Sequence, residues 1–171
     1  DLAASAGFVA EPAEADITRR PPRRAGATLI DGAAIRAILL KAGLLFAAVM
    51  AAYAWGYSRG LPRAAVQSCA FAAWIVGHTA LAFISRNDRE WIWRYGFFSN
   101  RIMNLWAIAA LGLLLLGIYF PPLREALRFG WVAPSDLMVA VVLALVLIAP
   151  AELRKALVKS RATLDALAKQ H

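Results

Sequence analysis

The chain has 171 residues, of which 61% are hydrophobic, and its mean hydropathy is +0.57. Ordinary soluble domains are about 45–50% apolar, so the composition excludes a soluble globule of this size and predicts a membrane protein. The net charge of +8 would suit nucleic acid or an anionic membrane surface, but the basic residues lie between long apolar runs, so we expect no nucleic-acid partner. Cys69 is the only cysteine, which excludes an intrachain disulfide and a cysteine metal site. It lies within an apolar run.

The first ten residues form an apolar segment that is too short to cross a bilayer. The chain begins with Asp1 and not with methionine, and residues 1–10 lack the leader of a signal peptide, so we interpret them as the end of a preceding transmembrane helix. Residues 11–34 form a polar connection, in which Pro21 and Pro22 prevent a regular helix. Its basic cluster, residues 19–24, can bind anionic lipid headgroups or act only as a topology signal, and both interpretations stay open.

Four apolar segments follow, and each is predicted to cross the membrane as a helix. A helix needs about 20 residues to cross a hydrocarbon core of ~30 Å. The predicted spans are residues 35–57, 64–85, 102–120 and 137–151, which together form a transmembrane domain over residues 35–151. In the first span, Gly43, Ala47 and Ala51 recur at four-residue spacing, which predicts a small-residue stripe suited to close helix packing.

The second span is more polar than the others, because it contains Gln67, Ser68, His78 and Thr79. Lipid offers no hydrogen-bond partner, so we expect these side chains to face other helices. Gln67, His78 and Thr79 could line an ion path, or they could simply form hydrogen bonds between helices.

Charged connections separate the spans and predict the orientation of the chain. Residues 86–101 combine arginines with interfacial aromatic residues, and residues 152–171 form an amphipathic tail that would extend the last helix into water or along the headgroups. Residues 11–41, 86–101 and 152–171 contain six, four and five basic residues, against four on the opposite side of the membrane. The positive-inside bias therefore predicts that residues 11–34, 86–101 and 152–171 are cytoplasmic.

A specific family resemblance begins at the first residue. The run DLAASAGFVAEPAEADITRRPPR, residues 1–23, is similar to the end of the sixth transmembrane helix of P-type cation-transporting ATPases and the loop that follows it. In that family an Asp near mid-membrane is followed, fifteen residues later, by Asp-Ile and then Arg/Lys-Pro-Pro-Arg. Asp1, Asp16 with Ile17, and residues 20–23 match this register without a gap, and the step from Glu11 to Pro12 resembles the prokaryotic members.

Three later motifs extend the resemblance to about Lys155. Residues 96–100 (GFFSN) resemble the family's G-x-F-S-N motif before the ninth helix. Residues 118–123 (IYFPPL) resemble its Y-x-P-P-L motif at the end of a helix, and residues 151–155 (AELRK) resemble the E-x-x-K motif that ends the tenth helix. The four spans would then be helices seven to ten. Two departures concern calcium pumps: Ala4 stands where many relatives have proline, and the region near Val76 and Gly77 has no carboxylate to match the glutamate of the eighth helix.

The resemblance implies that Asp1 is an oxygen ligand of the transported cation, although at a chain terminus it could simply be solvated. The family's phosphorylation site, dephosphorylation loop and magnesium hinge do not occur in this sequence. ATP and magnesium would therefore act in domains that precede Asp1, and we expect neither a cofactor nor ATP hydrolysis in this fragment alone. The spacing of His, Cys and carboxylate residues does not suggest a zinc or iron site.

The predicted fold class is all-α: an integral membrane bundle of four antiparallel transmembrane helices, with an N-terminal helix stub and an amphipathic C-terminal tail. The predicted function is that of a C-terminal transmembrane fragment of a prokaryotic-type P-type cation-transporting ATPase, which braces the ion-transport helices in the bacterial plasma membrane. Its expected partners are the lipid bilayer, the transported cation, and the missing N-terminal pump domains or another membrane protein. The alternative is a free-standing four-helix membrane protein with a structural or regulatory role.

Overall fold

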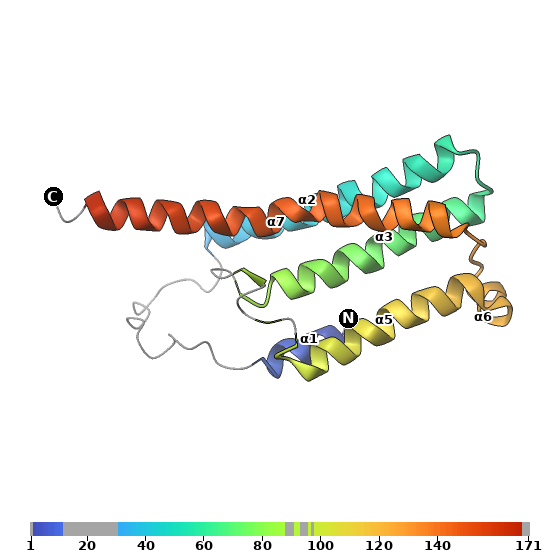
Figure 1. Ribbon diagram of the computed structural model, residues 1–171, viewed down its shortest axis with the longest axis horizontal. Coiled ribbons are helices and arrows are strands. Elements are labelled where there is room, and N and C mark those ends of the chain that lie inside the picture. The colour runs from blue at the N-terminus through green and yellow to red at the C-terminus, as the bar shows by residue number, and fades with distance from the viewer. Residues whose placement is uncertain (1, 12–30, 88–90, 93–95, 97, 169–171) are drawn as a thin grey trace.

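The computed structural model describes residues 2–11, 31–87, 91, 92, 96 and 98–168, and within these residues all regular structure is helical (Figure 1). The helices are α1 (Leu2–Val9), α2 (Gly32–Ser58), α3 (Arg63–Ile84), α5 (Arg101–Tyr119), α6 (Pro121–Ala126) and α7 (Pro134–Ala168). Four segments are long and apolar enough to cross a membrane: α2, α3, α5, and α7 as far as Lys155. The prediction of an all-α bundle with four spanning helices is confirmed.

Local capping contacts and turn residues fix where the helices begin and end. The Asp31 carboxylate accepts a hydrogen bond from the Ala34 amide at 2.7 Å and so caps the start of α2. Just beyond the end of α2, Gly60 has a φ of 67°, a left-handed conformation that favours glycine. Two prolines follow α5 and occupy the first turn of α6, where their missing amide hydrogens are not needed.

The longest helix, α7, has 35 residues and joins the fourth span to the tail as one element. Pro150 lies inside it and does not end it. Proline is tolerated within a membrane helix where neighbouring groups satisfy the carbonyl that the missing amide leaves free.

Three of the spanning helices, α2, α3 and α7, pack against one another, and α5 lies beside α3 with α1 at its N-terminal end (Figure 1). We call α2, α3 and α7 the three-helix core. Their contact surface is rich in alanines without exposed area: Ala48, Ala52, Ala72, Ala73, Ala140 and Ala144. Side chains this small allow helix backbones to approach closely, and such packing is a main source of helix association in lipid.

The small-residue stripe of α2 that packs differs by one position from the predicted stripe. Ala52 and Gly56 are buried, whereas Gly43 and Ala47 are exposed. A Cβ atom placed on Gly56 would lie 3.4 Å from the Cα of Val66 in α3, but one placed on Gly43 would have no neighbour within 4 Å. Ala51, the third member of the predicted stripe, is half-buried, so Gly43 and Ala47 face outward and the stripe as a whole is not the packing surface.

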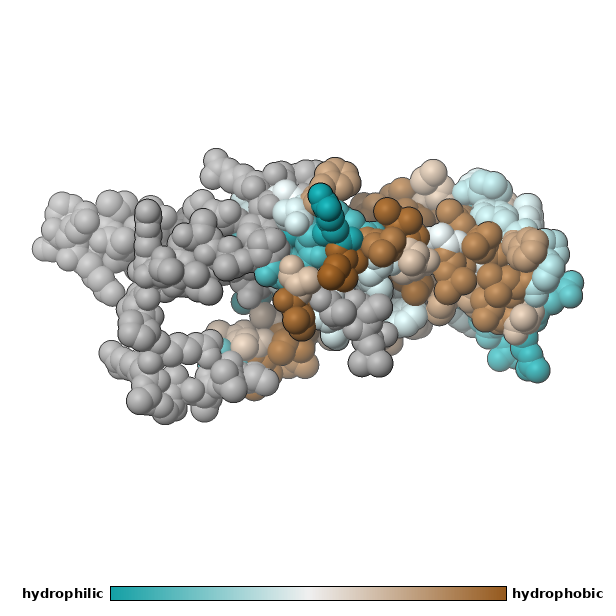
Figure 2. Space-filling model, turned by 90° about the horizontal axis from the view of Figure 1, so that it is seen from below, coloured by the Kyte–Doolittle hydropathy of each residue, from teal (hydrophilic) through white to brown (hydrophobic). Residues whose placement is uncertain are grey.

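The two ends of the bundle differ in structure, and we name them the α1 end and the α6 end after the short helices that lie there (Figure 1). Figure 2 shows hydrophobic residues over the middle of the described surface and hydrophilic residues gathered at the α6 end, as expected for a belt that faces lipid. At the α6 end, Arg59 pairs with Asp136 at 3.5 Å. In the connection between α6 and α7, the Gly130 amide donates hydrogen bonds to Ala64 O at 3.2 Å and to Ser68 Oγ at 3.0 Å.

Candidate functional site

The predicted cation ligand, Asp1, lies outside the described residues, which begin at Leu2. In the described part of the chain, His, Cys, Asp and Glu do not form a group of three or more that could hold a metal ion. The structure instead shows a polar network around the buried residues Arg86 and Asn100 at the α1 end, where α1, the residues after α3 and the start of α5 meet.

The centre of this network is Arg86, which follows α3 and whose side chain is only 1% exposed. Its guanidinium binds both oxygens of the Glu11 carboxylate, with Nε at 3.1 and 3.0 Å and Nη2 at 2.8 Å from the carboxylate oxygens. This bidentate geometry gives the strongest kind of arginine–carboxylate pair. A buried guanidinium requires such a partner, because an unpaired charge inside the protein destabilises the fold.

Arg86 also binds the segment that leads into α5. Its Nη1 donates to Gly96 O at 3.1 Å, its Nη2 donates to the Ser99 hydroxyl, and that hydroxyl donates to Gly96 O at 3.0 Å. Gly96 has a φ of 90°, which a residue with a Cβ atom would rarely adopt. The turn before α5 is therefore shaped around the Arg86 side chain.

Asn100 joins the start of α5 to the end of α1. Its Oδ1 accepts a hydrogen bond from the Met103 amide at 2.9 Å and caps α5, while its Nδ2 donates to Gly7 O at 2.7 Å and to Glu11 Oε2 at 2.8 Å. Gly7 belongs to the last turn of α1, whose carbonyls have no partner within the helix. One amide side chain thus satisfies the ends of two helices. We call Glu11, Arg86, Ser99 and Asn100, with the carbonyls of Gly7 and Gly96, the polar network.

Close packing accompanies the polar network. A Cβ atom on Gly7 would lie 3.3 to 3.4 Å from atoms of Met103, a residue of α5 with no exposed area. A contact this short leaves little room for a side chain at position 7, so α1 lies directly against α5.

Two further polar contacts join α7 and α2 to the same end of the bundle. Glu152 of α7 accepts a hydrogen bond from the Ile92 amide at 2.8 Å and pairs with Lys155 at 2.7 Å. Lys41 of α2 donates to the Ser85 hydroxyl at 3.0 Å. Lys41 of α2, Glu152 of α7 and Glu11, which follows α1, therefore all bind to the end of α3 or to the segment between α3 and α5.

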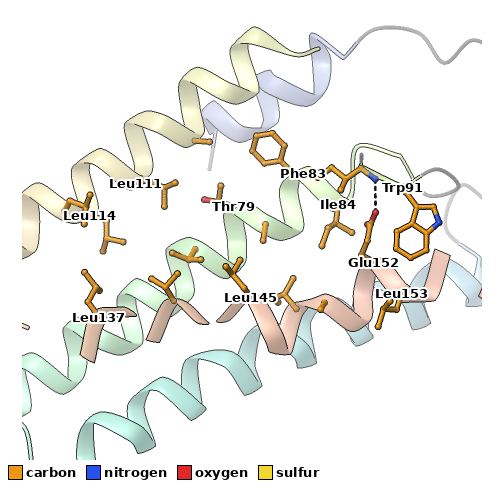
Figure 3. A pocket seen from close by; sticks show the side chains of 18 residues that line it. Thr79, Phe83, Ile84, Trp91, Leu111, Leu114, Leu137, Leu145, Glu152 and Leu153 are labelled. Atoms are coloured by element: carbon orange, nitrogen blue, oxygen red, sulfur yellow. Dashed lines mark hydrogen bonds between the residues drawn. The ribbon is translucent and has the colours of Figure 1, made fainter. Parts of the chain in front are cut away.

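An apolar cavity of about 800 Å³ lies between α3, α5 and α7 (Figure 3). Leu137 lines it near the start of α7, and Glu152 and Trp91 line it at the α1 end. Thr79 also lines it; this residue is 8% exposed, and its hydroxyl has no hydrogen-bond partner among the described residues. The cavity is thus mostly hydrophobic, with the Thr79 hydroxyl from the second half of α3 and the Glu152 carboxylate as polar groups in its lining.

The structure does not bring the polar residues of the second predicted span together. Gln67 is exposed near the start of α3. Ser68 is buried and donates to Ala64 O at 3.0 Å. The His78 ring lies 6.0 Å, between ring centroids, from the rings of Trp74 and Trp106, among aromatic side chains.

Sequence reasoning missed the pairing of Arg86 with Glu11, which are 75 positions apart. A signal for it existed, since Glu11, Ser99 and Asn100 belong to motifs that carry the family resemblance. Those motifs mark the two segments that the polar network joins.

Comparison with known proteins supports that resemblance. The family model described as "Cation transporting ATPase, C-terminus" matches residues 1–157. The mouse protein "Calcium-transporting ATPase type 2C member 2" is 27% identical over 130 residues, which are 75% of this chain and 14% of that protein. The "Probable cation-transporting ATPase F" of Mycobacterium bovis is 33% identical over 91 residues, which are 53% of this chain and 10% of that protein.

The chain therefore spans a small part of the length of the curated relatives it matches. These relatives come from both mammals and bacteria, so the assignment to the prokaryotic type stays a prediction. The predicted resemblance to the C-terminal transmembrane region of the pumps is itself confirmed. With the family model matched over residues 1–157, the chain belongs to the cation-transporting P-type ATPases, as a fragment from their C-terminal membrane region.

Proposed function

We propose that this chain braces the ion-transport helices of a cation pump. It would do so by holding the C-terminal end of a transmembrane helix of which α1 is the last part. The observation that carries the proposal is the attachment of α1 to α5 through Asn100 and through the contact of Gly7 with Met103. α1 is too short to form a stable helix alone, and these contacts place it beside residues about 90 positions later in the chain.

In the proposed pump, Asp1 would contribute a carboxylate oxygen to the transported cation. Carboxylates are preferred ligands of hard cations, and an ionisable residue within a membrane helix is costly unless it has a function. ATP and magnesium would act in domains that precede Asp1, and phosphorylation there would drive alternating access in the membrane. The excess of basic residues places the polar network on the cytoplasmic side in this proposal, and the membrane would be a bacterial plasma membrane.

The first test is the size of the native product. An antibody against residues 155–171, applied to membranes of the source cells, should detect a band several times larger than 18.5 kDa. A band near 18.5 kDa would contradict the pump proposal and favour the free-standing four-helix membrane protein.

The second test concerns the cation ligand. In the full-length protein, Asp1→Ala should abolish or strongly weaken the stimulation of ATP hydrolysis by the transported cation. Unchanged stimulation would show that Asp1 is not a ligand, and it would leave the bracing role to be judged by the size measurement.

A further inference from the structure

We propose that Arg86 is a positioning residue that sets the cation affinity of the pump, because through Glu11 it fixes one end of the helix whose other end carries the cation ligand. The inference rests on the proposed function, since it requires α1 to continue a cation-binding helix. It goes further by assigning the control of affinity to one ion pair, at a distance from the bound cation.

Arg86 can serve as a fixed point because the three-helix core holds it. Its backbone amide donates to Phe83 O at 3.3 Å, and its guanidinium carbon lies 5.9 Å from the centre of the Phe83 ring. Ile84, two residues earlier, is buried in a cluster with Ile148 of α7. The side chain itself is 1% exposed, so the surrounding atoms define its position.

Glu11 transmits this fixed position to α1. It follows Val9, the last residue of α1, by two positions, and its amide donates to Phe8 O at 3.3 Å, so it belongs to the turn that closes the helix. Both of its carboxylate oxygens bind Arg86, and one also accepts from Asn100. The carboxylate therefore attaches the end of α1 to α3 and α5 together.

The geometry of α1 makes its opposite end sensitive to this attachment. An eight-residue α-helix is about 12 Å long, so a tilt of roughly 10° about its fixed end moves its first residue by about 2 Å. Oxygen ligands bind Ca²⁺ at about 2.3–2.6 Å, so a displacement of that size removes a ligand at position 1. Holding the helix before the cation arrives avoids the cost of ordering it during binding, so loss of the ion pair should weaken affinity.

The experiment uses the full-length pump in liposomes and measures ATP hydrolysis against cation concentration. Ca²⁺, Mn²⁺, Na⁺ and K⁺ are tried separately, and the ion that stimulates the unchanged protein is used for all variants. Glu11→Gln removes the charge but keeps the shape, and Arg86→Gln removes the other charge. Glu125→Gln is the matched control, because Glu125 is an exposed carboxylate in α6, outside the polar network.

Glu11→Gln should raise the KM for the cation about fivefold or more, the usual lower range for coupling between sites, while kcat stays within about twofold. Glu125→Gln should leave both constants unchanged. The double variant should be no more severe than the more severe single variant, because the two residues act through one contact and neither charge is then left unpaired. If Arg86→Gln does not reach the membrane, Glu11→Gln decides alone.

Two results would overturn the inference. In the first, Glu11→Gln has the same KM as the Glu125→Gln control. In the second, kcat falls with KM unchanged, as expected for a general loss of folded pump. Failure of every cation to stimulate the unchanged full-length protein is a different result, since it refutes the proposed function itself.

Discussion

Gly130 provides the sharpest test of how the loop between α6 and α7 lies on the bundle. A Cβ atom at this position would lie 2.2 Å from the Ala65 backbone nitrogen and 2.5 Å from the Ala64 carbonyl carbon. Both neighbours are backbone atoms at the start of α3, which cannot rotate away. In Gly130→Ala the loop must therefore move until the distance exceeds about 3 Å, the shortest contact that Cβ atoms normally make.

The cost of this movement follows from the contacts that the loop would lose. The Gly130 amide would leave Ala64 O and Ser68 Oγ, and a buried donor without its partner costs about 1–3 kcal/mol. Phe129 would be displaced from Phe71, whose ring centroid lies 5.0 Å away, and such pairs contribute about 0.5–1.5 kcal/mol. We expect the free energy of unfolding to fall by about 2–4 kcal/mol.

The assay is unfolding of the purified protein in detergent by increasing SDS, followed by tryptophan fluorescence. Gly112→Ala is the control: Gly112 lies within α5, and a Cβ atom there has no neighbour within 4 Å. That change should be neutral or stabilising by up to about 1 kcal/mol, since alanine is the better helix former. Equal unfolding midpoints for Gly130→Ala and the unchanged protein would refute the close contact between this loop and the start of α3.

The same unfolding assay tests two other regions of the bundle. Ala52→Leu adds three carbons within the three-helix core and should lower the free energy of unfolding by about 1–3 kcal/mol. Ala47→Leu on the exposed face should change it little. Equal effects of the two changes would contradict the assignment of the buried stripe. Glu152→Ala removes both the acceptor of the Ile92 amide and the charge that faces Lys155, and should cost about 3 kcal/mol. Glu152→Gln keeps an acceptor and should cost less; the reverse order would refute this account of the contact.

Hydropathy and turn residues were sufficient to predict the spanning helices. The first three predicted spans each contain about 20 mostly apolar residues, and an α-helix satisfies its own backbone hydrogen bonds in lipid. The prolines that follow α5 mark the end of the third span, whereas α7 continues past the fourth predicted span without a break. The observed helices begin between one and three residues before the predicted spans, where capping residues such as Asp31 and Asn100 precede them.

Pattern alone could not identify which face of α2 is buried. The helix is apolar on all sides, and small residues recur every four positions along two adjacent faces, one with Gly43 and Ala47 and one with Ala52 and Gly56. Periodicity selects a face only where polar residues mark the opposite one. Gln67 shows a related effect, since it lies in the second turn of α3 at the α6 end, near the hydrophilic surface, and is exposed there.

The polar network could not be predicted as a site, because its members come from segments far apart in the sequence. Local patterns report helix caps and membrane spans, but they do not report which charged residue approaches which. The partner of Arg86 became evident only when the fold placed α1 beside the start of α5.

The alanine-rich contacts of α2, α3 and α7 have a mechanical consequence for the rest of the bundle. Backbones packed this closely leave no space for sliding, so these helices should move as one rigid body. α5 is different, since the cavity of about 800 Å³ separates part of it from α7, and it packs on α1, α6 and α3. A shift of α1 should therefore act first on α5, the helix it packs against, which has the cavity on the side that faces α7.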